Sequence, residues 1–189
     1  MKSILYFTFL VSTILLLGAG CESNEEVEQQ ASGIQHKLDS AWLARTASDD
    51  RKIANLELLV KECKMVPGID SSRYTSFESG ILNLKTSRYT QESMNTSSNI
   101  DDYDFATDTL LRNVKAFVGA NPELEKYQVI NQLLEEIGQA DDSLIIYRQG
   151  YDKTLDLYNA FVTKHEKKIT VLPAPYNTWK PRNYFRIAH

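Results

Sequence analysis

The sequence predicts an all-α protein, an antiparallel four-helix bundle of the up-down type with long helices. Three observations favour this class. Apolar residues recur at spacings of three and four through residues 34–170, which is the period of an amphipathic helix. No stretch alternates apolar and polar residues as a half-buried strand does. The breaks between the periodic stretches are short, and short connections join antiparallel neighbours.

Residues 1–20 resemble a bacterial lipoprotein signal peptide. Lys2 supplies a positive start, and the largely apolar residues 4–17 fall short of the ~20 residues that a membrane-spanning helix needs. Ala19-Gly20-Cys21 resembles a lipobox, whose cysteine thiol receives a diacylglycerol and becomes the N-terminus after cleavage. We therefore expect Cys21 to be lipidated and to bind membrane lipid. The alternatives are an ordinary signal peptide with a coincidental cysteine and an uncleaved N-terminal anchor.

Residues 21–33 predict a flexible acidic tether between the lipid and a helical domain of residues 34–170, because they are polar and rich in Glu, Gln and Ser. The first helix is expected over residues 34–65. Val66-Pro67-Gly68 ends it, since Pro disfavours helical geometry in the preceding residue and Gly permits the turn. Within this helix the polar residues 45–52 are expected to produce a kink or to face solvent.

The second helix is expected over residues 72–93, and residues 95–99 form a loop by their Asn, Thr and Ser composition. Asp101 and Asp102 suit the start of the third helix, because carboxylates accept hydrogen bonds from its unpaired N–H groups. Gly119 closes this helix.

Asn121-Pro122-Glu123 opens the fourth helix, with Asn as the cap and Pro at the first helical position. The apolar stripe from Tyr127 to Val162 contains no internal cap, which predicts one uninterrupted helix of ~60 Å. Residues 171–189 lose the helical period and contain three prolines. Because they also contain several aromatic side chains, we expect an extended tail packed on the bundle.

The composition excludes some classes of function. A net charge of −4 leaves no basic footprint for nucleic acid. The chain has two cysteines, so acylation of Cys21 leaves Cys63 without a disulfide partner. Cys63 is expected to be a small buried apolar residue, with a reactive thiol as the alternative.

No motif predicts catalysis, a cofactor or a metal site. The three histidines form no HxxxH or HExxH pattern, and no Glu-x-x-His pair of a di-iron bundle is present. Asp101, Asp102 and Asp104 lack the glycine and the distal glutamate of a calcium loop. We therefore expect a protein that is not an enzyme and that holds no cofactor.

A group of polar and aromatic residues on the fourth helix is the candidate interaction site. It consists of Tyr147, Arg148, Tyr151, Tyr158 and Asn159. One interpretation is core packing by the tyrosines, with Arg148 and Asn159 fixing the register of the bundle. The other is an exposed aromatic strip that binds an envelope protein or polymer, since Tyr is enriched at interfaces.

The same helix resembles the signature of the LemA family. Arg148, Tyr151 and the pair Tyr158-Asn159 have the spacing of that family's Arg, Tyr and Tyr-Asn. The start of the helix at residues 121–124 is similar to the family's Tyr-Pro-Asp-Leu.

Weaker similarities extend the resemblance over residues 38–186. Residues 51–61 are similar to the family's Leu-Ile-Pro-Asn-Leu-Val segment, and Tyr184-Phe185 resembles its C-terminal Tyr-Phe. Ala54 stands where the family has Pro, so the chain looks like a divergent lipoprotein member. The resemblance implies a membrane-tethered, extended helical bundle and adds no chemistry.

These features together predict a lipoprotein of the bacterial cell envelope that faces the periplasm or the cell exterior. Its expected role is that of a scaffold or protein-interaction module with an envelope protein as partner. The alternative is a ligand-binding or sensory lipoprotein with a pocket beside the fourth helix.

Overall fold

The computed structural model describes residues 22–185, apart from the side chain of Asn95. The expected signal peptide, Cys21 and the last residues of the tail lie outside this range. The all-α class is confirmed, because the described residues form helices and no strand. The helices are, in chain order, α2 (Asn24–Met65), η1 (Ser71–Arg73), α3 (Tyr74–Thr86), η2 (Ser93–Asn95), α4 (Ser97–Gly119), α5 (Pro122–Glu125), α6 (Gln128–Lys164), α7 (Glu166–Ile169) and η3 (Tyr176–Thr178).

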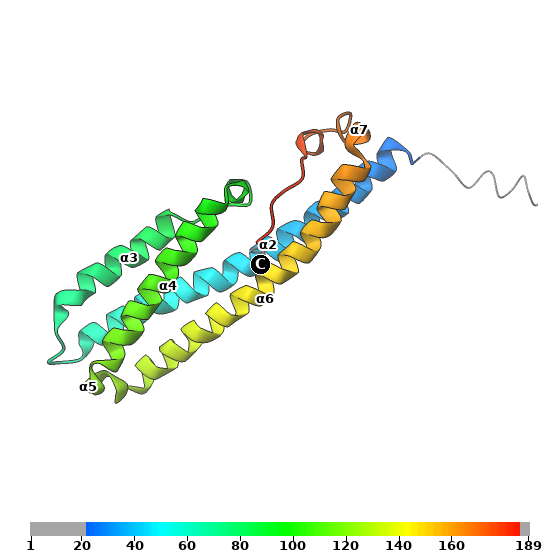
Figure 1. Ribbon diagram of the computed structural model, residues 1–189. Helices are drawn as coiled ribbons and strands as arrows, with labels where there is room; N and C mark the ends of the chain where they lie inside the picture. Colours follow the sequence, from blue (N-terminus) through cyan, green and yellow to red (C-terminus); the bar gives the residue numbers. More distant parts are fainter. Residues whose placement is uncertain (1–21, 186–189) are drawn as a thin grey trace, which may run out of the picture.

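The two longest helices, α2 and α6, lie side by side and run antiparallel (Figure 1). Near one end Glu22, just before α2, contacts Lys164 at the end of α6. Farther along, Ser48 Oγ donates a hydrogen bond to the carbonyl oxygen of Ala140 at 3.0 Å. A helix of 42 residues is about 60 Å long at 1.5 Å per residue, so this pair forms the long axis of the molecule.

Helices α3 and α4 accompany only one half of this pair (Figure 1). Helix α3 packs on α2, and α4 packs on α3. They approach closely at Gly80, where an added Cβ atom would lie 2.9 Å from Leu110 Cδ1 and would require that side chain to shift. The molecule is therefore a long helix pair with a shorter pair covering one end.

Residues 24–33, expected as part of a flexible tether, are the first turns of α2. Ser23 and Glu26 form a capping box: the Glu26 N–H donates to Ser23 Oγ, and the Ser23 N–H donates to Glu26 Oε2. Val27 and Ala31, one helical turn apart, are fully buried. The prediction of a tether was wrong because it was made from the polar composition alone. It did not recognise the capping box that starts the helix or the two small apolar residues, Val27 and Ala31, that the helix buries.

Two helix boundaries in the middle of the chain also differ from expectation. Helix α3 ends at Thr86 instead of continuing to residue 93, because the following segment turns Tyr89 and Met94 into the core. Helix α4 begins at Ser97, ahead of Asp101, since the extended backbone of Thr96 ends the loop early.

The expected single helix over residues 121–162 is broken into α5 and α6. Pro122 occupies the first position of α5, as predicted. Tyr127 then adopts an extended conformation, with φ −93° and ψ 111°, and α6 starts at Gln128. The break lets Leu124 turn fully into the core while the chain reverses direction between α4 and α6.

The segment after α6 consists of the short helix α7, a turn with η3, and a non-helical stretch over residues 179–185. Trp179 is buried, and Tyr184 and Phe185 pack partly buried against the core. The expectation of a wholly extended tail missed the single turn of η3.

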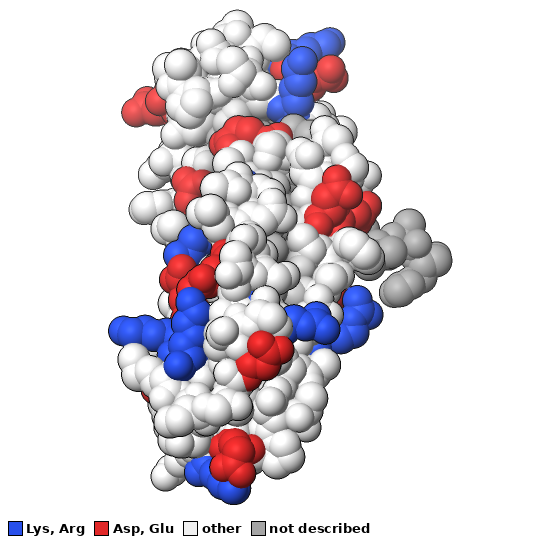
Figure 2. All heavy atoms as spheres, turned by 90° about the vertical axis from the view of Figure 1, so that its left-hand side faces the viewer, with Lys and Arg blue, Asp and Glu red and all other residues white. Residues whose placement is uncertain are grey.

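The surface carries charges of both signs. On the face formed by the α3–α5 end, Lys and Arg side chains are interspersed with Asp and Glu among uncharged residues (Figure 2). None of the helices between residues 22 and 185 combines the length and apolar character that a membrane span requires.

Candidate functional site

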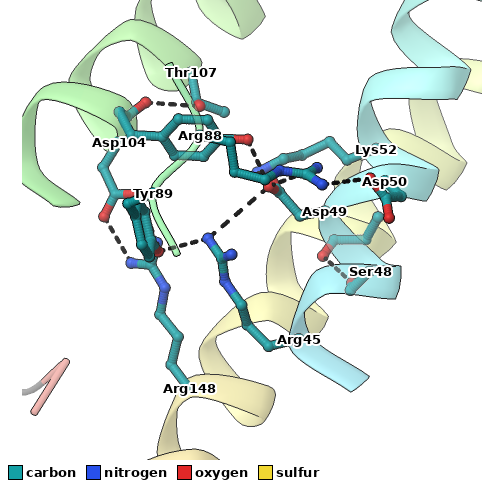
Figure 3. Close-up of polar contacts among 12 residues, drawn as sticks. Arg45, Ser48, Asp49, Asp50, Lys52, Arg88, Tyr89, Asp104, Thr107 and Arg148 are labelled. Carbon is teal, nitrogen blue, oxygen red and sulfur yellow. Dashed lines mark hydrogen bonds and ion pairs between the residues drawn. The ribbon is translucent and has the colours of Figure 1, made fainter. Parts of the chain in front are cut away.

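A cluster of buried and partly buried charged residues lies where α2, α4, α6 and the segment after α3 meet (Figure 3). We call it the charged cluster; its members are Arg45, Asp49 and Lys52 of α2, Arg88 and Tyr89 after α3, Tyr103 and Asp104 of α4, and Arg148 of α6. Arg45, Asp49 and Lys52 are at most 1% exposed. Charged residues are rarely buried to this degree unless they are paired.

Asp49 is the centre of the cluster. Its Oδ2 accepts a hydrogen bond from the Tyr103 hydroxyl at 2.5 Å and lies 3.1 Å from Arg88 Nη2. Lys52 Nζ is 3.7 Å from its Oδ1, and Arg45 Nη2 is 3.9 Å from Oδ2. One carboxylate thus faces three cations from two segments of the chain. Burial and the charge of Asp49 both raise the pKa of Tyr103, so this hydroxyl stays protonated and donates.

Arg148 joins α6 to α4 through a bidentate ion pair. Its two terminal nitrogens each lie 2.6 Å from an oxygen of Asp104. Burial opposes the charged form of Arg148, but the interactions with Asp104 and Tyr89 together outweigh it and raise the pKa of the guanidinium. The Tyr89 hydroxyl accepts hydrogen bonds from Arg148 at 3.1 Å and from Arg45 at 2.5 Å, so it bridges α6 and α2.

Aromatic rings surround the Arg45 guanidinium. Its central carbon lies 4.4 Å from the ring centroid of Tyr89 and 5.2 Å from that of Trp42. Among the described residues Arg45 Nε and Nη1 have no hydrogen-bond partner. Cation–π contacts therefore supply part of the electrostatic compensation that buried arginines require.

The cluster is suited to holding helices together. Its carboxylates are engaged by cations, and its most central members are closed off from solvent. No member pairs an accessible nucleophile with a base, which acyl or phosphoryl transfer would need. Among residues 22–185 no three His, Cys, Asp or Glu side chains are grouped as a metal site would require.

The candidate interaction strip lies mostly inside the molecule. Tyr151 and Tyr158 are at most 1% exposed, Tyr147 is half-buried, and Arg148 belongs to the charged cluster. Tyr151 and Tyr158 thus form a packed face, as the core-packing interpretation expects, and not an exposed aromatic strip. The reason is that this chain's own C-terminal segment covers the face.

Polar groups of α6 hold that segment in place. The Tyr158 hydroxyl donates to the Lys180 carbonyl oxygen at 3.1 Å. The Asn159 amide donates to the Arg182 carbonyl oxygen at 3.0 Å and accepts from the Arg182 N–H at 2.9 Å. The Phe185 N–H donates to Asp152 Oδ1 at 3.0 Å. Side chains thus replace the backbone pairing that an extended segment lacks.

Phe185 connects this segment to the charged cluster. Its ring centroid lies 5.4 Å from that of Tyr151 and 5.1 Å from the central carbon of the Arg148 guanidinium. Trp42 stacks on the same ring at 6.3 Å. These rings occupy the space between α6 and Phe185.

Sequence reasoning missed the charged cluster, because residues 45–52 were expected to kink the helix or to face solvent. A signal was present. Leu38, Trp42, Arg45, Asp49, Lys52 and Leu56 follow one another at spacings of four and three. The charged residues therefore continue the buried stripe of α2. Their spacing indicated a buried face, but their polarity indicated exposure.

We predict that Asn159→Ala frees the C-terminal segment, because it removes both hydrogen bonds to the Arg182 backbone. The expected cost is about 1–3 kcal/mol for the groups left unpaired. Hydrogen exchange should show faster exchange over residues 179–185, with α2 unchanged. Leu157→Ala, at a position that is 54% exposed on the same helix, is the control. Equal protection of the segment in the two variants would contradict the role given to Asn159.

We also predict that Cys63 is inert in the folded protein. It is 2% exposed, and burial raises the pKa of its thiol to about 11. At pH 8 roughly one thiol in a thousand is then the reactive thiolate. In a Cys21→Ser variant, where Cys63 is the sole thiol, an aromatic disulfide reagent should react only after unfolding in urea. Rapid stoichiometric reaction of the folded protein would restore the reactive-thiol alternative.

Comparison with protein-family models, with curated proteins and with solved structures finds no match to this chain. The functional interpretation therefore depends on its own residues.

Proposed function

We propose that this protein is a lipid-anchored helical rod of the bacterial cell envelope that serves as a scaffold or protein-interaction module. The proposal combines the lipobox-like Ala19-Gly20-Cys21 with the position of the first helix. The observation that carries it is the capped start of α2 at Asn24, so that only Glu22 and Ser23 separate Cys21 from the helix. A lipid on Cys21 would be joined directly to the long axis of the molecule.

The contacts of Glu22 favour a fixed attachment. Its carboxylate pairs with Lys164 at 3.1 Å and lies 3.4 Å from His165 Nδ1. Its carbonyl oxygen accepts a hydrogen bond from Lys168. The hydrogen bond from Lys164 lowers the pKa of Glu22, so the carboxylate is ionised near neutral pH. Glu22, the residue that follows Cys21, is thereby bound to the C-terminal end of α6 and to α7.

An attachment of this kind would hold the other end of the rod away from the membrane. If α2 stands upright, its C-terminal end lies about 60 Å from the lipid at 1.5 Å per residue. The α3–α5 end carries both signs of charge among uncharged residues (Figure 2), which suits a protein partner better than a polyanion. The engaged, buried charges of the cluster favour a non-enzymatic role.

Membership of the LemA family is part of the proposal. Two of the residues that carry the resemblance on α6 join it to other parts of the chain. Arg148 binds Asp104, and Asn159 binds the Arg182 backbone. A signature built from such residues would mark a shared helical architecture.

Energy transfer to a membrane-surface acceptor dye tests the upright rod. The full-length lipidated protein, carrying Cys63→Ala, is labelled at Met65→Cys or at Val171→Cys and bound to vesicles. The two positions are 62% and 66% exposed, so each accepts a label without disturbing the core. We expect strong transfer from position 171, near Glu22, and weak transfer from position 65. Equal transfer from both would mean that the rod lies flat or tumbles.

A further inference from the structure

The end of the rod beside Glu22 carries an exposed apolar loop. After α7 the chain runs through Val171-Leu172-Pro173-Ala174-Pro175-Tyr176, which we call the apolar loop. Leu172 is buried and fixes the loop to the core, whereas Val171 is 66% exposed and Pro173, Ala174 and Pro175 are also exposed. Three lysines of the same region, Lys164, Lys167 and Lys168, precede the loop.

The apolar loop and the expected lipid attachment lie at the same end of the molecule. Helix α7 packs against α2 and α6, and Figure 1 shows it beside the start of α2. Lys168 of α7 binds the Glu22 carbonyl oxygen directly. A membrane that receives the acyl chains of Cys21 would thus meet the loop as well.

The backbone of the loop is suited to a low-dielectric surface. Pro173 and Pro175 have no N–H group, so they carry no donor that would lose its water. The other N–H groups are largely satisfied within the loop region. Val171 donates to Lys168 O at 3.1 Å, Leu172 to Ile169 O at 3.1 Å and Tyr176 to Pro173 O at 3.1 Å. Entry into a lipid interface therefore costs little backbone desolvation compared with an ordinary loop.

We propose that the apolar loop is a second membrane contact, which enters the phospholipid headgroup region beside the acylated Cys21. Val171 and the prolines supply the apolar surface, and the half-buried Tyr176, which packs on Trp179, adds an amphipathic ring of the kind that favours this depth. The exposed Lys167 can reach a headgroup phosphate with its stem on apolar surface, whereas Lys164 and Lys168 already bind Glu22. The acidic Glu22 is already paired with Lys164, and Glu166 is exposed on α7. Such a contact orients the rod on its anchor.

This inference depends on the proposed lipid anchor, and its test separates the two. An environment-sensitive fluorophore is placed at Val171→Cys in the full-length lipidated protein with Cys63→Ala, bound to vesicles of phosphatidylethanolamine and phosphatidylglycerol. The control is the same label at Leu43→Cys, which is also 66% exposed. Position 43 lies about 30 Å along α2 from Glu22 at 1.5 Å per residue.

We expect the label at position 171 to emit at shorter wavelength than the label at position 43. It should also lose most of its intensity when the vesicles contain lipid with a quencher near the headgroup, while the control keeps its intensity. Protein that floats with the vesicles but gives the same water-like emission at both positions would overturn the membrane contact and leave the anchor intact. Protein that does not float with the vesicles would overturn the anchor and the contact together.

Discussion

Asp49→Ala should destabilise the folded protein by about 3–5 kcal/mol, because it leaves buried cations without their shared carboxylate. Arg45 is fully buried and would lose the carboxylate that lies 3.9 Å from its Nη2, whereas Lys52 would keep its ion pair with Asp141 at 2.9 Å. The Tyr103 hydroxyl would lose its acceptor as well. Urea unfolding followed by circular dichroism measures the loss as a lower midpoint.

The adjacent residue provides a matched control for this prediction. The Asp50 side chain is 62% exposed and binds Arg88 Nη1 at 2.5 Å. Because exposed ion pairs contribute little, Asp50→Ala should cost no more than about 1 kcal/mol. Asp49→Asn keeps the size of the side chain and removes its charge, so it should fall between the two. Equal midpoints for Asp49→Ala and Asp50→Ala would show that the charged cluster does not hold the helices together.

The largest effect on location is expected from Cys21→Ser, which should move the protein from the membrane fraction to the soluble fraction or leave an uncleaved precursor. Each buried methylene of an acyl chain contributes ~0.8 kcal/mol, so several chains together account for stable anchoring. Serine has no thiol to receive the diacylglycerol.

Cys63→Ala is the control for this experiment, because it removes the other cysteine and leaves the lipobox-like segment unchanged. We expect it to stay in the membrane fraction. Fractionation of cells and immunodetection give the readout. A Cys21→Ser protein that keeps both its membrane location and its mature mass would contradict lipid anchoring through this residue.

Local patterns predicted the helical class and most of the helices. The stripe of α6 and the prolines after it were sufficient to place a long helix before a non-helical tail. The predicted helix boundaries were wrong where a capping residue or a local backbone break sets the end of a helix. Ser23 and Glu26 start α2 inside a segment whose composition is typical of a linker. Tyr127 interrupts the fourth helix with no glycine or proline at its position.

The charged cluster could not be predicted from one segment alone, because its partners are far apart in the sequence. Asp49 is compensated by Arg88, and Arg148 by Asp104. Sequence spacing identifies the helix face that a residue occupies. Only tertiary packing shows which residue of opposite charge lies next to it. The same holds for Asn159, whose partner is the backbone of Arg182. Its polar side chain indicated neither a surface nor a core position.

We propose that the mature chain begins at an acylated Cys21, and the mass of the membrane-bound protein tests this proposal most directly. Digestion and mass spectrometry of protein purified from membranes should give an N-terminal peptide that starts at Cys21 and carries the mass of a diacylglycerol. The Cys21→Ser protein should lack this peptide. An N-terminus at Met1 or at another residue, with an unmodified Cys21 thiol, would contradict the account.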